Sequence, residues 1–355
     1  MPLWSWLFPT AAAGLLAALL TMPGGALLAA ACAIALIGTV IASVHHAEVV
    51  AHRVDEPFGT LVLAVAITVI EVALIVSVML AGGPEKAGLA RDTIFAAVMI
   101  IVNGVVGISV LVGALAHGEQ SFRIEGAGPA LAALVTLATL SLVLPTLTTS
   151  SLGPTYSEAQ LLFAAVVSFV LWALYVFVQT VRHRDYFLPT DDTAGDQAHA
   201  EAPSSLLAWA SFGLLLVSLI GVIGLTKALS PSIEDALAVV HAPKAVIGIL
   251  IALLVLLPES LAAVRHARAN RLQISMNLAL GSALASIGLT IPAVALVSIW
   301  LGLPLVLGLG PKDMVLLALS FLVGTITLSS GRTTLMQGAV HLVIFAVFVF
   351  LAFVP

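Results

Sequence analysis

Long uninterrupted apolar runs constrain this chain more than any other feature of its sequence. They recur along all 355 residues, of which 61% are hydrophobic and only 9% are charged. A soluble domain carries about 25% charged residues, so this chain could not cover a water-facing surface. A hydrocarbon core about 30 Å thick needs about 20 apolar residues per helix. The sequence therefore predicts an all-α polytopic membrane protein that contacts lipid.

The apolar runs divide into about eleven predicted membrane-spanning helices, separated by short segments that carry most of the charge. These helices cover approximately residues 3–21, 24–44, 58–82, 91–116, 127–149, 157–181, 204–228, 243–264, 273–301, 312–330 and 334–354. The longest break is acidic, with no Lys or Arg after Arg184, and contains Asp185, Asp191, Asp192, Asp196 and Glu201. We interpret it as a cytoplasmic linker and divide the chain into a first helix, a first repeat, the linker and a second repeat, at 1–23, 24–181, 182–203 and 204–355.

Charge and cysteine content exclude several classes of function. The net charge is −5 and there is no long basic run, which argues against nucleic acid as a partner. The single cysteine, Cys32, allows neither a disulfide within the chain nor a Cys-based zinc site. The first apolar segment lacks a basic n-region and a clear cleavage site, so we expect a retained helix and not a signal peptide.

The Lys and Arg residues are unevenly divided between the two predicted sides of the membrane. With the N-terminus in the cytoplasm, eight of them lie on the cytoplasmic side and five lie outside. Cytoplasmic loops are enriched in Lys and Arg. The sequence therefore predicts a cytoplasmic N-terminus and a C-terminus outside.

Two glutamates stand alone inside apolar runs, one in each half of the chain. Glu71 lies in the run that follows Pro57, and Glu259 lies in the run that begins at Pro243. Each run is followed by a short basic connection and then a long helix with glycines and small polar residues. The two runs are the third and eighth predicted helices, an odd difference, so they cross the membrane in opposite senses. This pattern predicts inverted repeats with a site near the membrane midplane.

The two carboxylates suggest a chemistry of alternating occupancy. A charged side chain at the bilayer centre costs about 2.5–3.5 kcal/mol, so two in matched positions indicate a function. Burial disfavours the charged carboxylate, which can then hold a proton near neutral pH. Two carboxylates hold either two protons or one divalent cation, and both occupants leave the site neutral. An empty site would be doubly charged, which predicts obligatory exchange of a cation for protons.

Further oxygen ligands are needed if the cation is calcium, which prefers about six to eight. Side-chain candidates are Thr68, Asn103, Ser282 and Ser286, with water and backbone carbonyls near Pro258, where we expect a local helix break because proline lacks an N–H. Sodium accepts fewer oxygens, so the cation stays open. The alternatives are a helix–helix hydrogen bond for Asn103, close packing for the serines and a structural ion pair for each glutamate. The Lys and Arg residues inside the predicted bounds all lie within two residues of the end of a span, and none lies in a span interior.

A histidine-rich segment follows the second predicted span. His45, His46, Glu48 and His52 do not form the H-E-x-x-H spacing of zinc proteases. We predict an amphipathic cytoplasmic segment, with pH sensing by the three histidines as the alternative. His341, within the last span, is expected to be a core histidine with satisfied hydrogen bonds.

Three stretches of the chain resemble bacterial ChaA-type calcium/proton (sodium/proton) antiporters. They are His45-His46-Ala47-Glu48 through Glu56-Pro57-Phe58-Gly59-Thr60 to Glu71, then Pro258-Glu259-Ser260 through Met276-Asn277-Leu278-Ala279-Leu280-Gly281-Ser282, and Ser330-Gly331-Arg332-Thr333. The wider group is the cation/proton exchangers of the calcium/cation antiporter superfamily. The resemblance implies eleven helices, two inverted five-helix repeats after a first helix, and alternating access in a bacterial inner membrane. It also implies that Glu71 and Glu259 bind the cation and the protons, without a cofactor.

The chain departs from the wider group beside both glutamates. That group has Gly-Asn three to four residues before each glutamate, whereas this chain has Ile67-Thr68 and Val255-Leu256. The missing amides leave calcium, sodium and potassium as candidate cations, with calcium export in exchange for protons the first prediction. An intramembrane enzyme would need a nucleophile–base pair or a metal triad within the spans, and two single carboxylates make a poor channel ring. The sequence does not indicate an oligomeric state.

Overall fold

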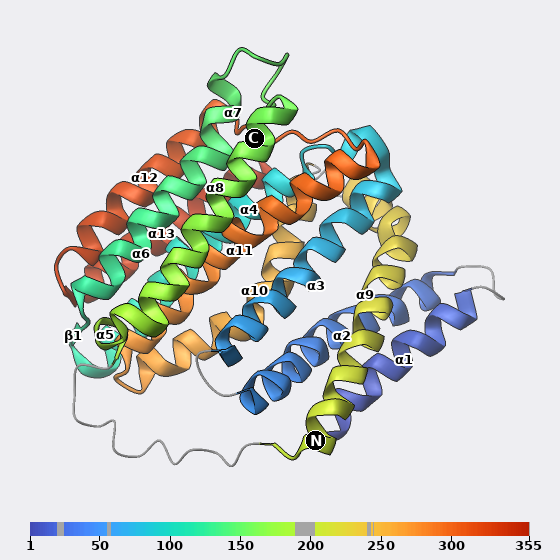
Figure 1. Cartoon of the computed structure of the whole chain (residues 1–355), viewed down its shortest axis with the longest axis horizontal. Helices are drawn as coiled ribbons and strands as arrows, with labels where there is room; N and C mark the ends of the chain where they lie inside the picture. The colour runs from blue at the N-terminus through green and yellow to red at the C-terminus, as the bar shows by residue number, and fades with distance from the viewer. Residues whose placement is uncertain (20–24, 55–57, 189–202, 240–242, 244, 355) are drawn as a thin grey trace. The chain divides into compact units, whose positions relative to one another are not determined.

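The computed structural model describes residues 1–19, 25–54, 58–188, 203–239, 243 and 245–354, and these are helical almost throughout (Figure 1). Within those residues, ten helices are long and apolar enough to cross a membrane, and a shorter apolar helix, α1 (Leu3–Leu19), precedes them. The predicted all-α polytopic fold with about eleven spans is confirmed.

Some predicted features lie outside the described residues. One is the boundary between 1–23 and 24–181, and another is Pro57, the proline that precedes the third helix. Most of the acidic linker also lies outside them, including Asp191, Asp192, Asp196 and Glu201.

The chain forms two compact units, each built from two separate stretches of sequence. The first unit contains residues 1–87 and 198–244, and the second contains residues 88–197 and 245–355. Each unit thus takes segments from both sequence halves. The compact units do not follow the predicted repeats, and the repeat boundaries stay a prediction.

In the first unit, α2 packs against three other helices. The helices are α1, α2 (Ala26–Arg53), α3 (Phe58–Gly82) and α9 (Ser205–Val239), and η1 (Gly83–Lys86) is a short 3-10 turn after α3. α2 contacts α1, α3 and α9, and α9 also contacts α1 and α3. These four helices therefore form one bundle.

Two helices of the first unit are longer than predicted. The predicted ends at residues 44 and 228 were wrong, since α2 continues to Arg53 and α9 continues through Pro231 to Val239. The cause is visible for α2: His46 is fully buried, and one ring nitrogen lies 2.8 Å from the backbone oxygen of Ser5 in α1. The histidine segment is therefore a continuation of α2, and its cytoplasmic location stays a prediction.

The second unit contains the remaining elements. The chain order is α4 (Leu89–Met99), the π-helix η2 (Ile100–Val105), α5 (Val106–His117), β1 (Gln120–Ser121), α6 (Ile124–Ala138), η3 (Thr139–Val143), α7 (Leu144–Leu147), α8 (Glu158–Phe177), η4 (Val178–Arg182), η5 (Arg184–Phe187), α10 (Ala245–Arg268), α11 (Leu272–Leu301), α12 (Pro311–Leu328), β2 (Arg332–Thr333) and α13 (Leu335–Phe353). β1 and β2 form a small antiparallel pair in which Gln120 faces Thr333.

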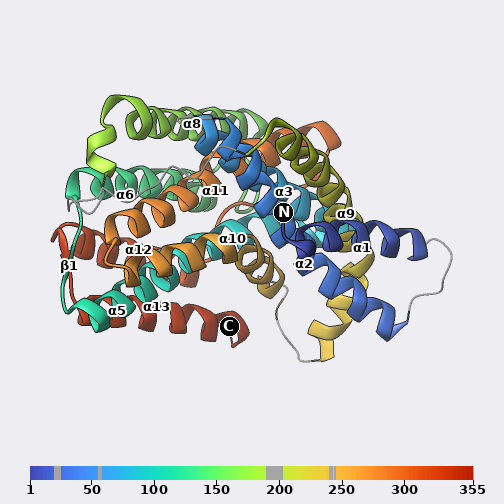
Figure 2. The same cartoon turned by 90° about the horizontal axis from the view of Figure 1, so that it is seen from below.

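The helices of the second unit form a stack. α8 packs on α11, α11 on α10, α10 on α4 and α5, and α5 on α13. Figure 2 shows this order from α8 at the upper edge to α13 at the lower edge. The α4–η2–α5 helix lies inside the stack, and 89% of its most apolar 18-residue stretch is buried. Most side chains of that stretch therefore meet protein and not lipid.

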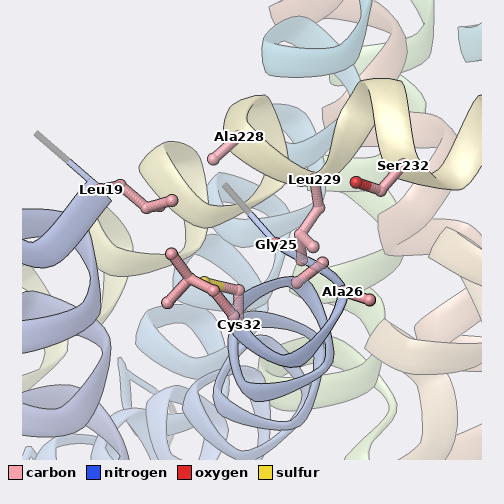
Figure 3. A pocket seen from close by; sticks show the side chains of 9 residues that line it. Leu19, Gly25, Ala26, Cys32, Ala228, Leu229 and Ser232 are labelled. Carbon is pink, nitrogen blue, oxygen red and sulfur yellow. The ribbon is translucent and has the colours of Figure 1, made fainter. Parts of the chain in front are cut away.

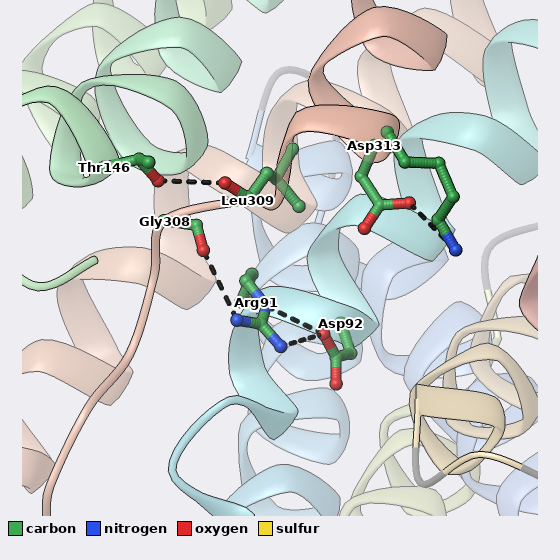
Figure 4. Close-up of polar contacts among 7 residues, drawn as sticks. Arg91, Asp92, Thr146, Gly308, Leu309 and Asp313 are labelled. Carbon is green, nitrogen blue, oxygen red and sulfur yellow. Dashed lines mark hydrogen bonds and ion pairs between the residues drawn. The ribbon is translucent and has the colours of Figure 1, made fainter. Parts of the chain in front are cut away.

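An extended strap, residues 303–310, joins α11 to α12 and is fixed by hydrogen bonds (Figure 4). Arg91 Nε donates to Asp92 Oδ1 at 2.8 Å, and its Nη1 donates to the carbonyl of Gly308 at 3.3 Å. Thr146 Oγ1 donates to the carbonyl of Leu309 at 2.9 Å. At the start of α12, Lys312 and Asp313 form a loose ion pair, 3.9 Å from Nζ to Oδ1. The strap therefore uses backbone groups to join helices far apart in sequence.

A pocket in the first unit lies where α1 ends and α2 begins, beside α9 (Figure 3). Its lining is mostly apolar and includes Leu19, Cys32 and Leu229, with the hydroxyl of Ser232 at its edge. Such a lining offers a cation few oxygen ligands, so we do not assign the cation site to it.

The close approach of α10 to α4 predicts a size limit at Gly248. A Cβ at this position would lie 2.8 Å from the backbone carbon of Asp92 and the backbone nitrogen of Thr93. Since backbone atoms cannot move aside cheaply, Gly248→Ala is expected to destabilise the protein by about 1–3 kcal/mol. The measurement is the melting temperature of the purified protein in detergent. Gly281→Ala is the matched control, because a Cβ there meets nothing within 4 Å; equal melting of both variants would contradict the prediction.

Candidate cation site

Glu71 lies in α3, in the first unit, among apolar neighbours. Its side chain is only 2% exposed, and Ile70 and Leu74 beside it are also buried. Thr68 precedes it by three residues, so both side chains lie on one face of the helix. The Thr68 hydroxyl donates to the carbonyl of Ala64 at 2.8 Å. Its oxygen keeps lone pairs, so Thr68 and Glu71 together present oxygens from one face of α3.

Glu259 lies in α10, in the second unit, and is half-buried. The hydroxyl of Ser282 in α11 donates to Glu259 Oε2 at 3.0 Å. Ser286, buried one turn further along α11, lies on the same side of that helix as Ser282. The structure thus joins two residues that the sequence proposed separately, although this contact does not itself test cation binding.

The expected helix break at Pro258 is absent. α10 continues without interruption from Ala245 to Arg268 with the proline inside it. Proline still cannot donate an N–H to the carbonyl of Leu254, four residues earlier. The prediction of a break was therefore wrong, because the neighbouring turns and the packing of α10 hold the helix together around one missing hydrogen bond.

The helical irregularity lies instead in the α4–η2–α5 helix. Residues 100–105 form a π-helix, which widens the turn around Asn103. Such π segments occur frequently at functional sites. Neither this segment nor those at η3 and η4 was predicted, because a π turn leaves no distinct residue pattern and depends on the packing around it.

Asn103 and Glu259 lie at the same level along two parallel helices. Gly248 of α10 abuts Asp92 of α4 near the start of both helices. At their other end, Gln120 Nε2, just beyond α5, donates to the carbonyl of Ala267 at 2.8 Å. Asn103 lies eleven residues after Asp92, and Glu259 lies eleven residues after Gly248. Asn103 and Glu259 therefore lie at about the same level of the stack.

The amide of Asn103 nevertheless bonds to α12 and α13. Its Nδ2 lies 2.8 Å from Ser320 Oγ, and its Oδ1 lies 3.2 Å from His341 Nδ1. The other ring nitrogen of His341 lies 3.1 Å from Thr327 Oγ1. His341 is thus a buried histidine with satisfied hydrogen bonds, as predicted. Asn103 makes hydrogen bonds between helices, which was the alternative to its role as a cation ligand.

Ser320 and Thr327 were missed by reasoning from the sequence. They lie seven residues apart in α12 and therefore on one helix face. That spacing of small polar residues was a usable signal for a polar helix contact. The spacing does not identify their partners, because Asn103 lies 217 residues from Ser320 and His341 lies 14 residues from Thr327.

The three histidines of α2 differ in their surroundings. His46 is buried, His45 packs against Trp4 with ring centroids 5.1 Å apart, and His52 is exposed. Among the described residues, no group of three or more His, Cys, Asp or Glu side chains could hold a metal ion. pH sensing by this segment stays a prediction.

Comparison with known proteins decides the family. Residues 24–181 and 210–354 match the family described as sodium/calcium exchanger protein. The chain belongs to this family. It is 49% identical to the protein y4hA of Sinorhizobium fredii (strain NBRC 101917 / NGR234), over 100% of this chain and 97% of the relative. It is also 35% identical to the sodium-potassium/proton antiporter ChaA of Escherichia coli (strain K12), over 90% of this chain and 87% of ChaA.

A solved structure shares the fold. The native YfkE structure superposes with a TM-score of 0.74 at 18% identity, covering 99% of this chain and 100% of that one. The predicted family resemblance and the inverted-repeat fold are thereby confirmed. The exchanger family member described here is a secondary cation antiporter and not an enzyme, and the transported ions are its substrates.

Proposed function

We propose that this exchanger couples cation export to proton entry through Glu71 and Glu259. The observation that carries the proposal is the carboxylate of Glu259 at the level of the π-helix, hydrogen-bonded to Ser282. A second support is the carboxylate of Glu71, 2% exposed within an apolar helix. Each carboxylate is neutral when protonated and neutralised when a cation binds. Alternating occupancy therefore avoids the cost of an empty charged site.

Calcium is the first candidate cation. Two carboxylates match the charge of one divalent ion, and the hydroxyls of Thr68 and Ser282 add oxygen ligands of the kind that calcium prefers. Sodium or potassium is the second candidate. It is favoured by the engagement of Asn103 with His341, which leaves fewer oxygens for the cation, and by the similarity to the sodium-potassium/proton antiporter ChaA.

The test is cation-dependent loss of a pH gradient. Everted membrane vesicles containing the protein are loaded with protons by respiration, and calcium, sodium or potassium is then added. We expect the added cation to dissipate the gradient, and the most effective cation to identify the substrate. Vesicles without the protein are the control. If no cation dissipates the gradient faster than in the control, the proposed exchange is refuted.

Ser282→Ala is expected to weaken the site without abolishing exchange. The change removes one neutral donor to the Glu259 carboxylate, a hydrogen bond to a charged group worth about 1.5–3 kcal/mol. We therefore expect the apparent KM for the cation to change by about tenfold or more in the vesicle assay. Ser275→Ala is the matched control, since Ser275 also lies in α11, is fully buried, and its hydroxyl has no hydrogen-bond partner among the described residues. Equal KM values for the two variants would argue against a role for Ser282.

We propose a bacterial inner-membrane location with the N-terminus in the cytoplasm and the C-terminus outside. Support comes from the Lys and Arg distribution and from the bacterial relatives. Cys32 is the single native cysteine, so a cysteine-free background needs one substitution. A cysteine placed at exposed Glu158 should then react with an impermeant reagent from outside, and one at exposed Arg268 from the cytoplasmic side only. Reversed labelling would overturn the orientation.

A further inference from the structure

Four polar side chains form a buried chain of hydrogen bonds inside the second unit. They come from three helical segments: Asn103 from η2, Ser320 and Thr327 from α12, and His341 from α13. None of the four is more than 1% exposed. The order of contacts is Ser320, Asn103, His341 and Thr327, with distances of 2.8, 3.2 and 3.1 Å. We call these residues the Asn103 network.

The single hydroxyl proton of Ser320 determines which groups of the Asn103 network donate hydrogen bonds and which accept them. Ser320 Oγ is within donating distance of the carbonyl of Leu316 (2.7 Å) and of Met99 Sδ (3.4 Å), and both groups are only acceptors. Its oxygen therefore accepts from Asn103, which must turn its NH2 group toward Ser320. The amide oxygen of Asn103 then faces His341, so Nδ1 of that ring carries the proton.

Thr327 completes this assignment. With the proton on Nδ1, the neutral ring of His341 offers a lone pair at Nε2, and the Thr327 hydroxyl donates to it. The carbonyl oxygen of Asn103 is thereby held by a ring whose tautomer is itself fixed. A buried network in which every member is satisfied is costly to rearrange.

Close packing of α5 and α13 holds the His341 ring in place. A Cβ at Gly107 would lie 3.0 Å from the Cβ of His341, and a Cβ at Gly338 would lie 2.6 Å from the backbone nitrogen of Leu111. The two helices thus nearly touch at the network, as helices do in membranes when small residues line their crossing. The ring cannot withdraw from Asn103 without separating them.

We propose that His341 sets cation selectivity by holding the amide oxygen of Asn103 away from the cation. This inference rests on the proposed function, since it concerns the cation bound at Glu259. Asn103 lies at the level of Glu259 and within a π turn, and an amide oxygen is a ligand that calcium accepts. Calcium needs more oxygens than sodium does, so withholding this one penalises calcium more. The Asn103 network therefore lowers the calcium-to-sodium preference of the site, whichever of the candidate cations is exported.

The experiment compares calcium with sodium in the vesicle assay for variants of His341. His341→Leu removes the donor to Asn103 and introduces an apolar side chain of similar size. We expect the ratio of kcat/KM for calcium to that for sodium to rise about tenfold, within the range that orienting partners have on metal affinity. His341→Asn is the conservative variant, because its amide nitrogen takes the place of Nδ1. Its ratio should stay within about twofold of the unaltered protein.

A second pair of variants separates selectivity from structural damage. In an Asn103→Leu background, His341→Leu should cause no further change in the ratio, because the oxygen it would release is gone. Ser109→Ala, a buried hydroxyl deletion in α5 outside the Asn103 network, should leave the ratio unchanged. If His341→Leu protein is not recovered from membranes, Thr327→Val gives the same test. It removes the hydroxyl that donates to His341 Nε2, so the ring is no longer held in one tautomer. The calcium-to-sodium ratio should then rise by a smaller factor than in His341→Leu.

Two results would overturn the inference. One is an unchanged calcium-to-sodium ratio in His341→Leu protein that still exchanges cations, or in Thr327→Val protein where the first is not recovered. The other is an equal rise with and without Asn103. Both are distinct from failure of the proposed function, which would appear as normal exchange after substitution of Glu71 and Glu259.

Discussion

Replacing Glu71 or Glu259 by glutamine is expected to abolish cation-dependent proton release while the protein still inserts in the membrane. Glutamine has nearly the same size as glutamate, but it neither binds a transported proton nor balances the charge of a cation. Removing one partner of a buried charge interaction costs about 3–5 kcal/mol. That cost corresponds to at least about a 100-fold loss of affinity, so exchange in the vesicle assay should fall to the level of vesicles without the protein.

The control for these variants is a glutamate outside the apolar helix interiors. Glu158 lies in the first turn of α8 and is exposed, so Glu158→Gln should exchange cations at the normal rate. Protein amount is measured in the same vesicles, which separates loss of exchange from loss of insertion. Normal exchange by both Glu71→Gln and Glu259→Gln would remove the proposed site altogether. Loss in one variant alone would restrict it to one unit.

The membrane-spanning helices could be predicted because their cause is local. A run of about 20 apolar residues must span as a helix, since backbone groups in lipid have no other hydrogen-bond partners. The same argument makes a lone glutamate in such a run conspicuous, so Glu71 and Glu259 could be selected from the sequence alone. The ends of α2 and α9 could not, because they depend on tertiary contacts such as that between His46 and Ser5.

The partners of the polar residues also lay beyond a local pattern. Asn103 was selected as an intramembrane amide, but its contacts with Ser320 and His341 span 217 and 238 residues. Ser282 was selected as a separate candidate ligand, and its contact with Glu259 follows from the short connection that makes α10 and α11 neighbouring antiparallel helices. The difference is one of distance along the chain: neighbouring helices constrain each other, whereas distant helices meet only in the folded stack.

A charge in the segment between the third and fourth predicted spans is buried in the first unit. Lys86, in η1 after α3, is 4% exposed, and its Nζ lies 2.8 Å from Glu234 Oε1 in α9. A Cβ at Gly82 would collide with Lys86 Cγ, so the lysine stem lies against the helix end. The pair joins the end of the helix that carries Glu71 to α9. The Glu234 side chain is 45% exposed, so water screens part of the interaction.

Glu234→Gln is expected to destabilise the protein because it leaves the buried ammonium of Lys86 without its counter-charge. Removing one partner of a fully buried pair lowers the free energy of unfolding by about 3–5 kcal/mol. Because Glu234 is partly exposed, we expect Glu234→Gln to lower it by about 1–3 kcal/mol. Lys86→Met keeps the apolar stem and removes the charge, so the double variant Lys86→Met/Glu234→Gln should recover most of the lost stability. The measurement is the melting temperature in detergent.

The exposed neighbour Asp235 provides the matched control for this cycle. Asp235→Asn removes the same charge one residue away and should have the same melting temperature as the unaltered protein. Since one end of the pair is desolvated, the effect of Glu234→Gln should also persist at high salt, where interactions between exposed charges are screened. If the double variant melts below Glu234→Gln, the lysine charge has a second stabilising partner, and α3 is not joined to α9 by this pair alone.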